Sequence, residues 1–212
     1  MLPAIVLASA SPARLQLLRN VGIEPAVVVS DIDETAMVAA HNWQSAEEIA
    51  GGLAVAKAEH VGTRLLEPEV VVIGCDSMME FQGHLHGKPG DAAAARHRLA
   101  EMSGGSGFLH TGHHVIYNSA NGRRTASAVT STEVVFHELT EAEIDAYVAT
   151  GEPLHVAGAY TLDSLGGPFI KEIHGDPSNV IGLSLPTLRH LFAEVGIAWD
   201  LVLRTVAARQ AG

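Results

Sequence analysis

The chain begins with an apolar strand that leads directly into a helix. Ala4 to Ala8 has the length and composition of a buried strand, and small hydroxyl residues end it. Ser11 is a favoured N-cap residue and Pro12 suits the first helical position, so Arg14 falls in the first helical turn. Because strands followed at once by helices are the units of α/β folds, this start predicts an α/β protein.

The same turn contains the groups of an anion site. A helix start offers free backbone N–H groups, and Ser9, Ser11 and Arg14 add two hydroxyls and a guanidinium. A cation in the first turn costs about 0.3–1 kcal/mol against the helix dipole, and a bound anion would offset that cost. A capped helix with a solvated arginine explains the segment equally well by itself.

The rest of the chain continues the α/β pattern and then becomes rich in β-structure. Further strands are expected at Ala26 to Val29 and Val70 to Ile73. Ser45 and Glu48 form a capping box at the start of a helix that reaches His60, and Asp91 can cap another. That second helix would bury Ala92, Ala95, Leu99 and Met102. The expected later elements are a hairpin of Phe108 to Tyr117 with Arg123 to Phe136, a helix from Thr140 to Gly151, a strand-like region from Ala157 to Ile173, and a helix from Leu185 to Val195.

Composition limits the classes of protein that this chain can belong to. Its 212 residues suit a single domain, 1–212, and 24 acidic against 13 basic residues give a net charge of −11. This charge argues against binding of a nucleic acid polymer. No segment has the length of a membrane span or the pattern of a signal peptide, so no membrane partner is expected. The single cysteine, Cys75, excludes an internal disulfide and favours the cytoplasm.

Three charged side chains are candidates for chemistry. Asp76 follows the apolar run Val70 to Ile73, where open α/β sheets place groups that contact ligands, so it is a candidate base or metal ligand; turn aspartates are also common there. Lys88 lies in a Gly-Lys-Pro turn and is a candidate phosphate contact, although the segment is not a Walker A loop. Glu34 belongs to the acidic segment Asp31 to Thr35, which is typical of a solvated loop. Glu34 and Asp76 could together hold Mg²⁺ or Mn²⁺, since these ions prefer oxygen ligands.

A series of short motifs resembles a known family when the motifs are read in order. They are Ser9-Ala-Ser-Pro-Ala-Arg14, Asp33-Glu34-Thr35, Leu53-Ala-Val-Ala-Lys57-Ala, Ile73-Gly-Cys-Asp76-Ser, Gly87-Lys88-Pro89, His110-Thr111-Gly112, Ala157-Gly-Ala-Tyr160 and Gly175-Asp-Pro-Ser-Asn179. The series covers nearly the whole chain and resembles the Maf family of nucleotide pyrophosphatases.

The resemblance implies a fold and a reaction. The fold would be an elongated mixed sheet flanked by helices, in two lobes with a central cleft, similar to Maf proteins and inosine triphosphatases. The reaction would be hydrolysis of a nucleoside triphosphate to the monophosphate and pyrophosphate with a divalent cation, Mg²⁺ or Mn²⁺. It would remove non-standard or excess nucleotides. The family is also associated with division arrest.

The resemblance also implies roles for individual residues. Asp76 would be the general base and Glu34 its acidic partner, both also being metal ligands. Lys57 and Lys88 would neutralise charge during phosphoryl transfer. Substrate-binding positions would be Ser9, Ala13, Arg14, Ser77, Thr111 and Asp163.

Three of these positions depart from the family pattern and bear on the substrate. Ala13 stands where the family often has a second arginine. Ser77 and Asp163 stand where members acting on dTTP and UTP have threonine and glutamine. A buried acid at Asp163 would accept hydrogen bonds from guanine or an exocyclic amine, which suggests a purine or modified base.

Two other functions remain open at this point. The altered arginine pair permits a nucleotide-binding regulator with little or no turnover. The chain could also hydrolyse another phosphoanhydride, such as a nucleoside diphosphate compound. A homodimer is plausible for each of the three functions.

Overall fold

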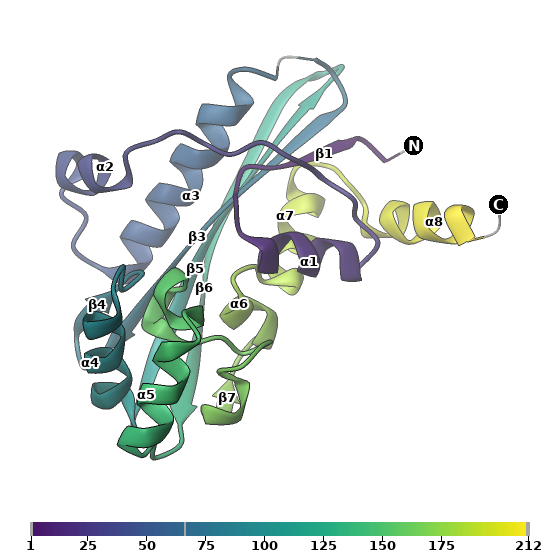
Figure 1. Cartoon of the computed structure of the whole chain (residues 1–212). Helices are drawn as coiled ribbons and strands as arrows, with labels where there is room; N and C mark the ends of the chain where they lie inside the picture. Colours follow the sequence, from purple (N-terminus) through teal and green to yellow (C-terminus); the bar gives the residue numbers. More distant parts are fainter. Residues whose placement is uncertain (1, 66, 211–212) are drawn as a thin grey trace.

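The computed structural model describes residues 2–65 and 67–210 and contains one mixed sheet of seven strands (Figure 1). The strand order is β2-β1-β3-β5-β6-β7, and β4 also pairs with β3. β1 is parallel to β2 and β3, whereas the other pairs are antiparallel. The strands are β1 (Ala4–Leu7), β2 (Ala26–Val27), β3 (Val70–Phe81), β4 (His84–His86), β5 (Ser106–Ser119), β6 (Gly122–Phe136) and β7 (Ile170–His174).

Helices cover both faces of this sheet, with α3 on one side of the long strands and α1 and α7 on the other (Figure 1). The α-helices are α1 (Pro12–Asn20), α2 (Glu34–His41), α3 (Ala46–Gly62), α4 (Ala92–Met102), α5 (Glu141–Ala149), α6 (Pro177–Ile181), α7 (Leu185–Glu194) and α8 (Trp199–Gln210). Short 3-10 helices are η1 (Glu152–His155), η2 (Ala157–Ala159) and η3 (Gly167–Phe169). Among the described residues, no helix has the length and apolarity that crossing a membrane requires.

Two large hydrophobic cores lie along the same sheet. One packs α1, α7 and α8 against β1 and one half of β3, around residues such as Leu18, Ile73 and Phe192. The other packs α4 and α5 against the far half of β3, around Met79 and Leu99. The long strands β3, β5 and β6 therefore connect two lobes, each with its own core.

Helix α3 lies unusually close to the sheet because two glycines face it. A Cβ atom on Gly74 of β3 would lie 2.3 Å from the Ala54 carbonyl oxygen. A Cβ atom on Gly112 of β5 would lie 2.1 Å from the Ala50 carbonyl oxygen. The helix backbone thus rests directly on the strand backbones, and this contact fixes the position of every side chain that α3 sends toward β3.

Local signals in the sequence predicted most helix starts and the hairpin correctly. Ser11, Ser45, Asp91 and Thr140 are the N-cap residues of α1, α3, α4 and α5, and the capping box expected at Ser45 and Glu48 is present. β5 and β6 form the predicted antiparallel hairpin. Of the residues expected on the buried face of α4, Ala92 is exposed, because it lies in the first turn beyond the core.

The strand-like region expected from Ala157 to Ile173 was wrong for most of its length. It contains two 3-10 helices, and a strand begins only at Ile170. Gly158 has φ 71° and Ala159 φ 63°, which an extended strand does not allow. The carboxylate of Glu152 supplies hydrogen bonds in place of a strand partner, since it accepts from Tyr147, Thr161, Ser164, Leu165 and Gly166.

Two further expectations need correction, and one helix was not expected. The acidic segment is not a loop throughout, because Asp33 caps α2 and Glu34 is its first residue. The second strand ends at Val27, two residues earlier than expected. Helix α8 was not anticipated; it packs Val202 into the first core.

Candidate active site

Strand β3 has one edge that is not paired with another strand along its middle part, between Ile73 and Met79. β1 pairs with this edge only as far as Ile73, where its chain leaves the sheet, and β4 pairs with it again from Met79. In the described chain no strand covers the edge between these two points, while β5 pairs with the opposite edge throughout. Asp76 therefore lies inside β3 and not past its end, as the sequence had suggested, because β3 continues to Phe81.

Three of the predicted residues meet on the α3 side of this edge. Lys57 Nζ on α3 lies 2.5 Å from Asp76 Oδ1 and 2.7 Å from Glu34 Oε1 on α2. Lys57 and Asp76 are buried, with 9% and 8% exposure, whereas Glu34 is exposed. The ammonium group thus bridges two carboxylates, and each carboxylate has a second oxygen that does not bond to it in this arrangement.

Burial changes the acidity of two neighbouring groups on β3. Desolvation raises the pKa of Asp76 above its ordinary value of 3.8, although the nearby charges of Lys57 and Arg14 act to lower it. A carboxylate with a raised pKa is a stronger base. Burial also raises the pKa of the Cys75 thiol to about 11, so Cys75 stays protonated and is a poor metal ligand at neutral pH.

Arg14 approaches the same edge from the opposite face of the sheet. Its guanidinium donates to Ser9 Oγ, the Cys75 carbonyl, Ser77 Oγ and the Gly182 carbonyl, at 2.7–3.0 Å. All four acceptors are uncharged, and the side chain is only 9% exposed. A guanidinium has five N–H groups, so these bonds use four of them and leave a buried positive charge beside the start of α1.

The Arg14 contacts continue into a chain of hydroxyl groups. Ser77 Oγ lies 2.9 Å from Thr111 Oγ1, which donates to the Asn179 carbonyl at 3.1 Å. Because successive residues of a strand face opposite sides, Ser77 belongs to the Arg14 side and Asp76 to the Lys57 side. The contacts of Arg14 and those of Lys57 with Asp76 therefore lie on opposite faces of the sheet and come together only at the unpaired edge of β3.

The remaining predicted residues do not join these groups directly. Ala13 is half-buried beside Arg14 on α1. Lys88 is exposed, two residues past β4, at the end of the unpaired edge where β4 rejoins β3. Asp163, expected to be buried, is exposed in the loop before η3. Since its carboxylate is open to water, the burial on which its role as a base-reading acid was argued does not hold.

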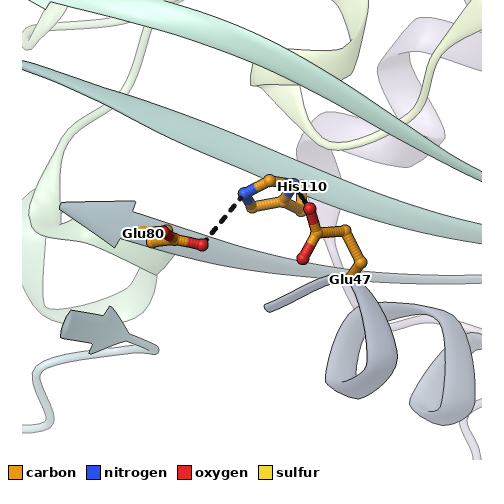
Figure 2. Close-up of side chains that lie close together, drawn as sticks. All are labelled: Glu47, Glu80 and His110. Carbon is orange, nitrogen blue, oxygen red and sulfur yellow. Dashed lines mark ion pairs between the residues drawn. The ribbon is translucent and has the colours of Figure 1, made fainter. Parts of the chain in front are cut away.

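Two groups of side chains could hold a divalent cation. The free oxygens of Glu34 and Asp76 are suitable donors for a hard cation, although Lys57 now contacts both carboxylates and offsets one of their two negative charges. A second group, Glu47, Glu80 and His110, has ligand atoms that all lie within 4.8 Å of one another (Figure 2). The described part of the chain can therefore accommodate such an ion.

Sequence reasoning missed several of these contacts. Asn179 is fully buried and donates from Nδ2 to the Leu109 carbonyl and to Thr132 Oγ1, which fixes α6 against β5 and β6. Glu80 shares a face of β3 with Asp76, since the two differ by four positions. That spacing was the available signal, but the partners Glu47 and His110 come from other elements and could not be read from it.

These features define a class of protein. It is an α/β protein with one partly unpaired edge on strand β3. The buried guanidinium of Arg14 lies on one face of the sheet at this edge, and the Asp76–Lys57 pair lies on the other face. Comparison with known families agrees with this class and makes it specific. The chain belongs to the Maf family, since the family model described as "Maf-like protein" matches residues 4–195.

Close relatives from several organisms carry one name. A protein of Salinispora tropica is 52% identical over 196 residues, covering 91% of this chain and 84% of its own length. A protein of Streptomyces coelicolor is 52% identical over 195 residues, covering 91% and 90%. One of Rhodococcus opacus is 48% identical over 205 residues, covering 92% and 93%. Each is named nucleoside triphosphate pyrophosphatase.

Proposed function

We propose that this protein hydrolyses nucleoside triphosphates to the monophosphate and pyrophosphate, and so removes non-standard or excess nucleotides. The observation that carries the proposal is the meeting of buried Arg14 and the Asp76–Lys57 pair at one unpaired strand edge. The names of the relatives support it. The triphosphate would lie along this edge, between the end of β1 and the start of β4 pairing.

The Arg14 side of the edge would bind phosphate. Arg14 contributes mainly its charge, since four of its five N–H groups already hold protein oxygens. The hydroxyl of Ser9 and the backbone N–H of Ala13 would donate the direct hydrogen bonds, since the Ser11 and Arg14 N–H groups already donate to serine hydroxyls. Thr111 acts one step further away, because its hydroxyl contacts Ser77.

The Asp76 side would carry out the hydrolysis. Water is a poor nucleophile, and Asp76 would accept its proton as general base. Lys57 would stabilise the negative charge that develops on the phosphoryl oxygens, and Glu34 would keep Lys57 and the water in place. Lys88 would reach the outer phosphates from the exposed turn after β4.

A divalent cation fits the free oxygens of Glu34 and Asp76, and we propose Mg²⁺ or Mn²⁺ there. When bound, it would supply positive charge to the phosphate oxygens and lower the pKa of bound water. Binding would require Lys57 to give up part of its contact with the two carboxylates.

The preferred nucleobase is a separate proposal. We keep a purine or modified base, supported by Ser77 and by Asp163, which differ from the residues of pyrimidine-specific members. Because Asp163 is exposed, it would read the base only if the bound nucleotide covers it. An Asp163→Gln variant should change the ratio of kcat/KM between purine and pyrimidine substrates, and an unchanged ratio would refute this role.

The test of the reaction is pyrophosphate release from a panel of ordinary and modified nucleoside triphosphates, with Mg²⁺ or Mn²⁺. Asp76→Asn should retain nucleotide binding and lose most turnover, at least about 100-fold, because the base is removed and the pocket is kept. Near-normal turnover by Asp76→Asn would contradict its role. Tight binding without release by the wild type would favour a nucleotide-binding regulator, and release from nucleoside diphosphate compounds would favour the other phosphoanhydride activity.

Four broader expectations belong to this proposal. We expect the reaction in the cytoplasm, in keeping with the single cysteine, and by a single domain spanning residues 1–212. A homodimer and a link to division arrest stay predictions.

A further inference from the structure

Three potential metal ligands converge from three different elements, away from the residues assigned to hydrolysis (Figure 2). Glu80 lies on β3, His110 lies on the neighbouring strand β5, and Glu47 lies in the first turn of α3. His110 Nε2 is 3.7 Å from Glu80 Oε2, and His110 Nδ1 is 3.5 Å from Glu47 Oε1. The two glutamates therefore flank one imidazole ring.

The imidazole of His110 is buried with one nitrogen lacking a hydrogen bond. His110 is 4% exposed, and its Nε2 has no hydrogen-bond partner among the described residues. Its Nδ1 lies 2.8 Å from Ser131 Oγ on β6. When Nδ1 donates to this hydroxyl, Nε2 presents a lone pair toward Glu80. Metal-binding histidines typically have this arrangement, in which a second residue fixes the ring and its tautomer.

We propose that Glu47, Glu80 and His110 form a binding site for a first-row transition-metal dication such as Zn²⁺ or Mn²⁺. Two ligand atoms on one zinc ion lie less than about 4.4 Å apart, because each is about 2.0–2.2 Å from the metal. The distance of 3.7 Å between His110 Nε2 and Glu80 Oε2 satisfies this limit, and Glu47 has an oxygen within 4.8 Å of the ligand atoms of the other two residues. Glu47 contacts the Nδ1 side of the ring, so its side chain, which is 48% exposed, has to rotate toward Nε2 to complete a site with Glu80 and His110.

The ligand chemistry decides between classes of metal. An imidazole nitrogen favours Zn²⁺ and other first-row transition metals over Mg²⁺, which prefers oxygen ligands and retains its water. Two carboxylates neutralise the charge of a dication. Three protein ligands leave a position for water, as in zinc sites with an open coordination.

This site is distinct from the proposed oxygen site of Glu34 and Asp76. Glu80 is four residues beyond Asp76 on the same face of β3, which is about 13 Å along an extended strand. The bound metal would fasten the first turn of α3 to β3 and β5. The proposal does not rest on nucleotide hydrolysis, and metal binding can be measured without substrate.

The experiment is a Zn²⁺ titration of the metal-free full-length protein in a large excess of Mg²⁺, monitored by competition with a chromophoric zinc indicator. The wild type should bind one equivalent, and its Tm should rise with Zn²⁺ because the folded state is selectively bound. His110→Asn keeps a donor for Ser131 and removes Nε2, so binding should weaken at least about 100-fold. Ser131→Ala should weaken it by about 10- to 100-fold through the lost orientation.

Two controls separate this site from other zinc ligands. His84→Asn removes an exposed histidine on β4, and Asp76→Asn removes a carboxylate of the proposed oxygen site; both should bind Zn²⁺ like the wild type. If His110→Asn does not fold, Glu80→Gln must show the same loss. The proposal is overturned if the wild type binds no stoichiometric Zn²⁺ in excess Mg²⁺, or if binding survives in both His110→Asn and Glu80→Gln.

Discussion

At the scale of single residues, the position of Lys57 is the most consequential feature. A lysine on an otherwise apolar helix face could simply extend its stem along the core and reach water. Here it is buried between Asp76 and Glu34. This arrangement places its charge beside the base that we propose for the reaction, so we expect Lys57 to affect both stability and catalysis.

Replacing Lys57 with Met should separate these two effects. We expect kcat to fall at least about 100-fold, because the charge facing the phosphoryl group is lost. The free energy of unfolding should fall by about 3 kcal/mol, since Asp76 keeps a buried and unpaired charge. Pyrophosphate release at saturating nucleotide and urea unfolding measure the two quantities.

The double variant Lys57→Met/Asp76→Asn is the matched control for Lys57. It should recover most of the lost stability, because no unpaired carboxylate is buried, while turnover stays absent. Full activity of the single variant would mean that Lys57 has only a packing role.

His113 predicts a pH dependence of stability. It is 1% exposed and accepts a hydrogen bond from the Ser184 N–H at Nε2. Burial, assisted by the charge of Arg14, lowers its pKa from 6.5 to about 4. The folded protein thus binds this proton less readily than the unfolded chain. The stabilisation is complete above the unfolded pKa and is lost as the pH falls toward the folded one.

Between neutral pH and about pH 5, this histidine should reduce the free energy of unfolding by about 2 kcal/mol. His113→Gln keeps an acceptor for Ser184 and removes the titration. Urea unfolding at both pH values should therefore show a smaller acid-induced loss in the variant. An equal loss in both proteins would contradict a neutral, buried His113.

At the scale of elements, the contact of α3 with the sheet determines whether the site exists. Lys57 and Glu47 lie on α3, whereas Asp76, Glu80 and His110 lie on β3 and β5. The absence of a Cβ atom at Gly74 and Gly112 lets the helix backbone approach the strands. The distances between the side chains of α3 and those of β3 and β5 in the two proposed sites depend on this close approach.

Gly74→Ala should push α3 away from β3. Its Cβ would lie 2.3 Å from the Ala54 carbonyl oxygen, a backbone atom that moves only with the helix. We expect a loss of about 1–3 kcal/mol in unfolding free energy and a fall in kcat, because Lys57 is displaced from Asp76. Urea unfolding and pyrophosphate release test this expectation.

Gly51→Ala, a substitution on α3 itself, is the control for Gly74→Ala on β3. Its Cβ would meet only the Val129 side chain, at 3.1 Å, and a helical alanine is favoured over glycine by about 1 kcal/mol. This variant should keep near-normal activity and stability. Equal losses in both variants would contradict a specific role of Gly74 in the close approach of α3.

At the scale of the whole molecule, one sheet joins two hydrophobic cores and leaves part of one strand edge unpaired between them. β1 ends early, so its chain carries Ser9 and α1 across the edge of β3. β4 then closes the far part of the edge and leads to Lys88. The length difference between neighbouring strands therefore creates the unpaired edge at which we propose that the nucleotide binds.

The sequence by itself determined the elements whose signals are local. Caps at Ser11, Ser45, Asp91 and Thr140 and the alternating hairpin strands depend on nearest neighbours along the chain, so they could be predicted from it. The family motifs likewise selected Arg14, Lys57 and Asp76 as site residues.

Only the tertiary structure decided which of these residues meet. The Lys57–Asp76 and Arg14–Gly182 contacts join positions 19 and 168 residues apart, and neither spacing has a local pattern. The exposure of Asp163 and the convergence of Glu47, Glu80 and His110 also depend on how distant elements pack. Local hydrogen bonds and periodicity fix an element from its own residues, whereas contacts between elements depend on the burial and register of the complete sheet.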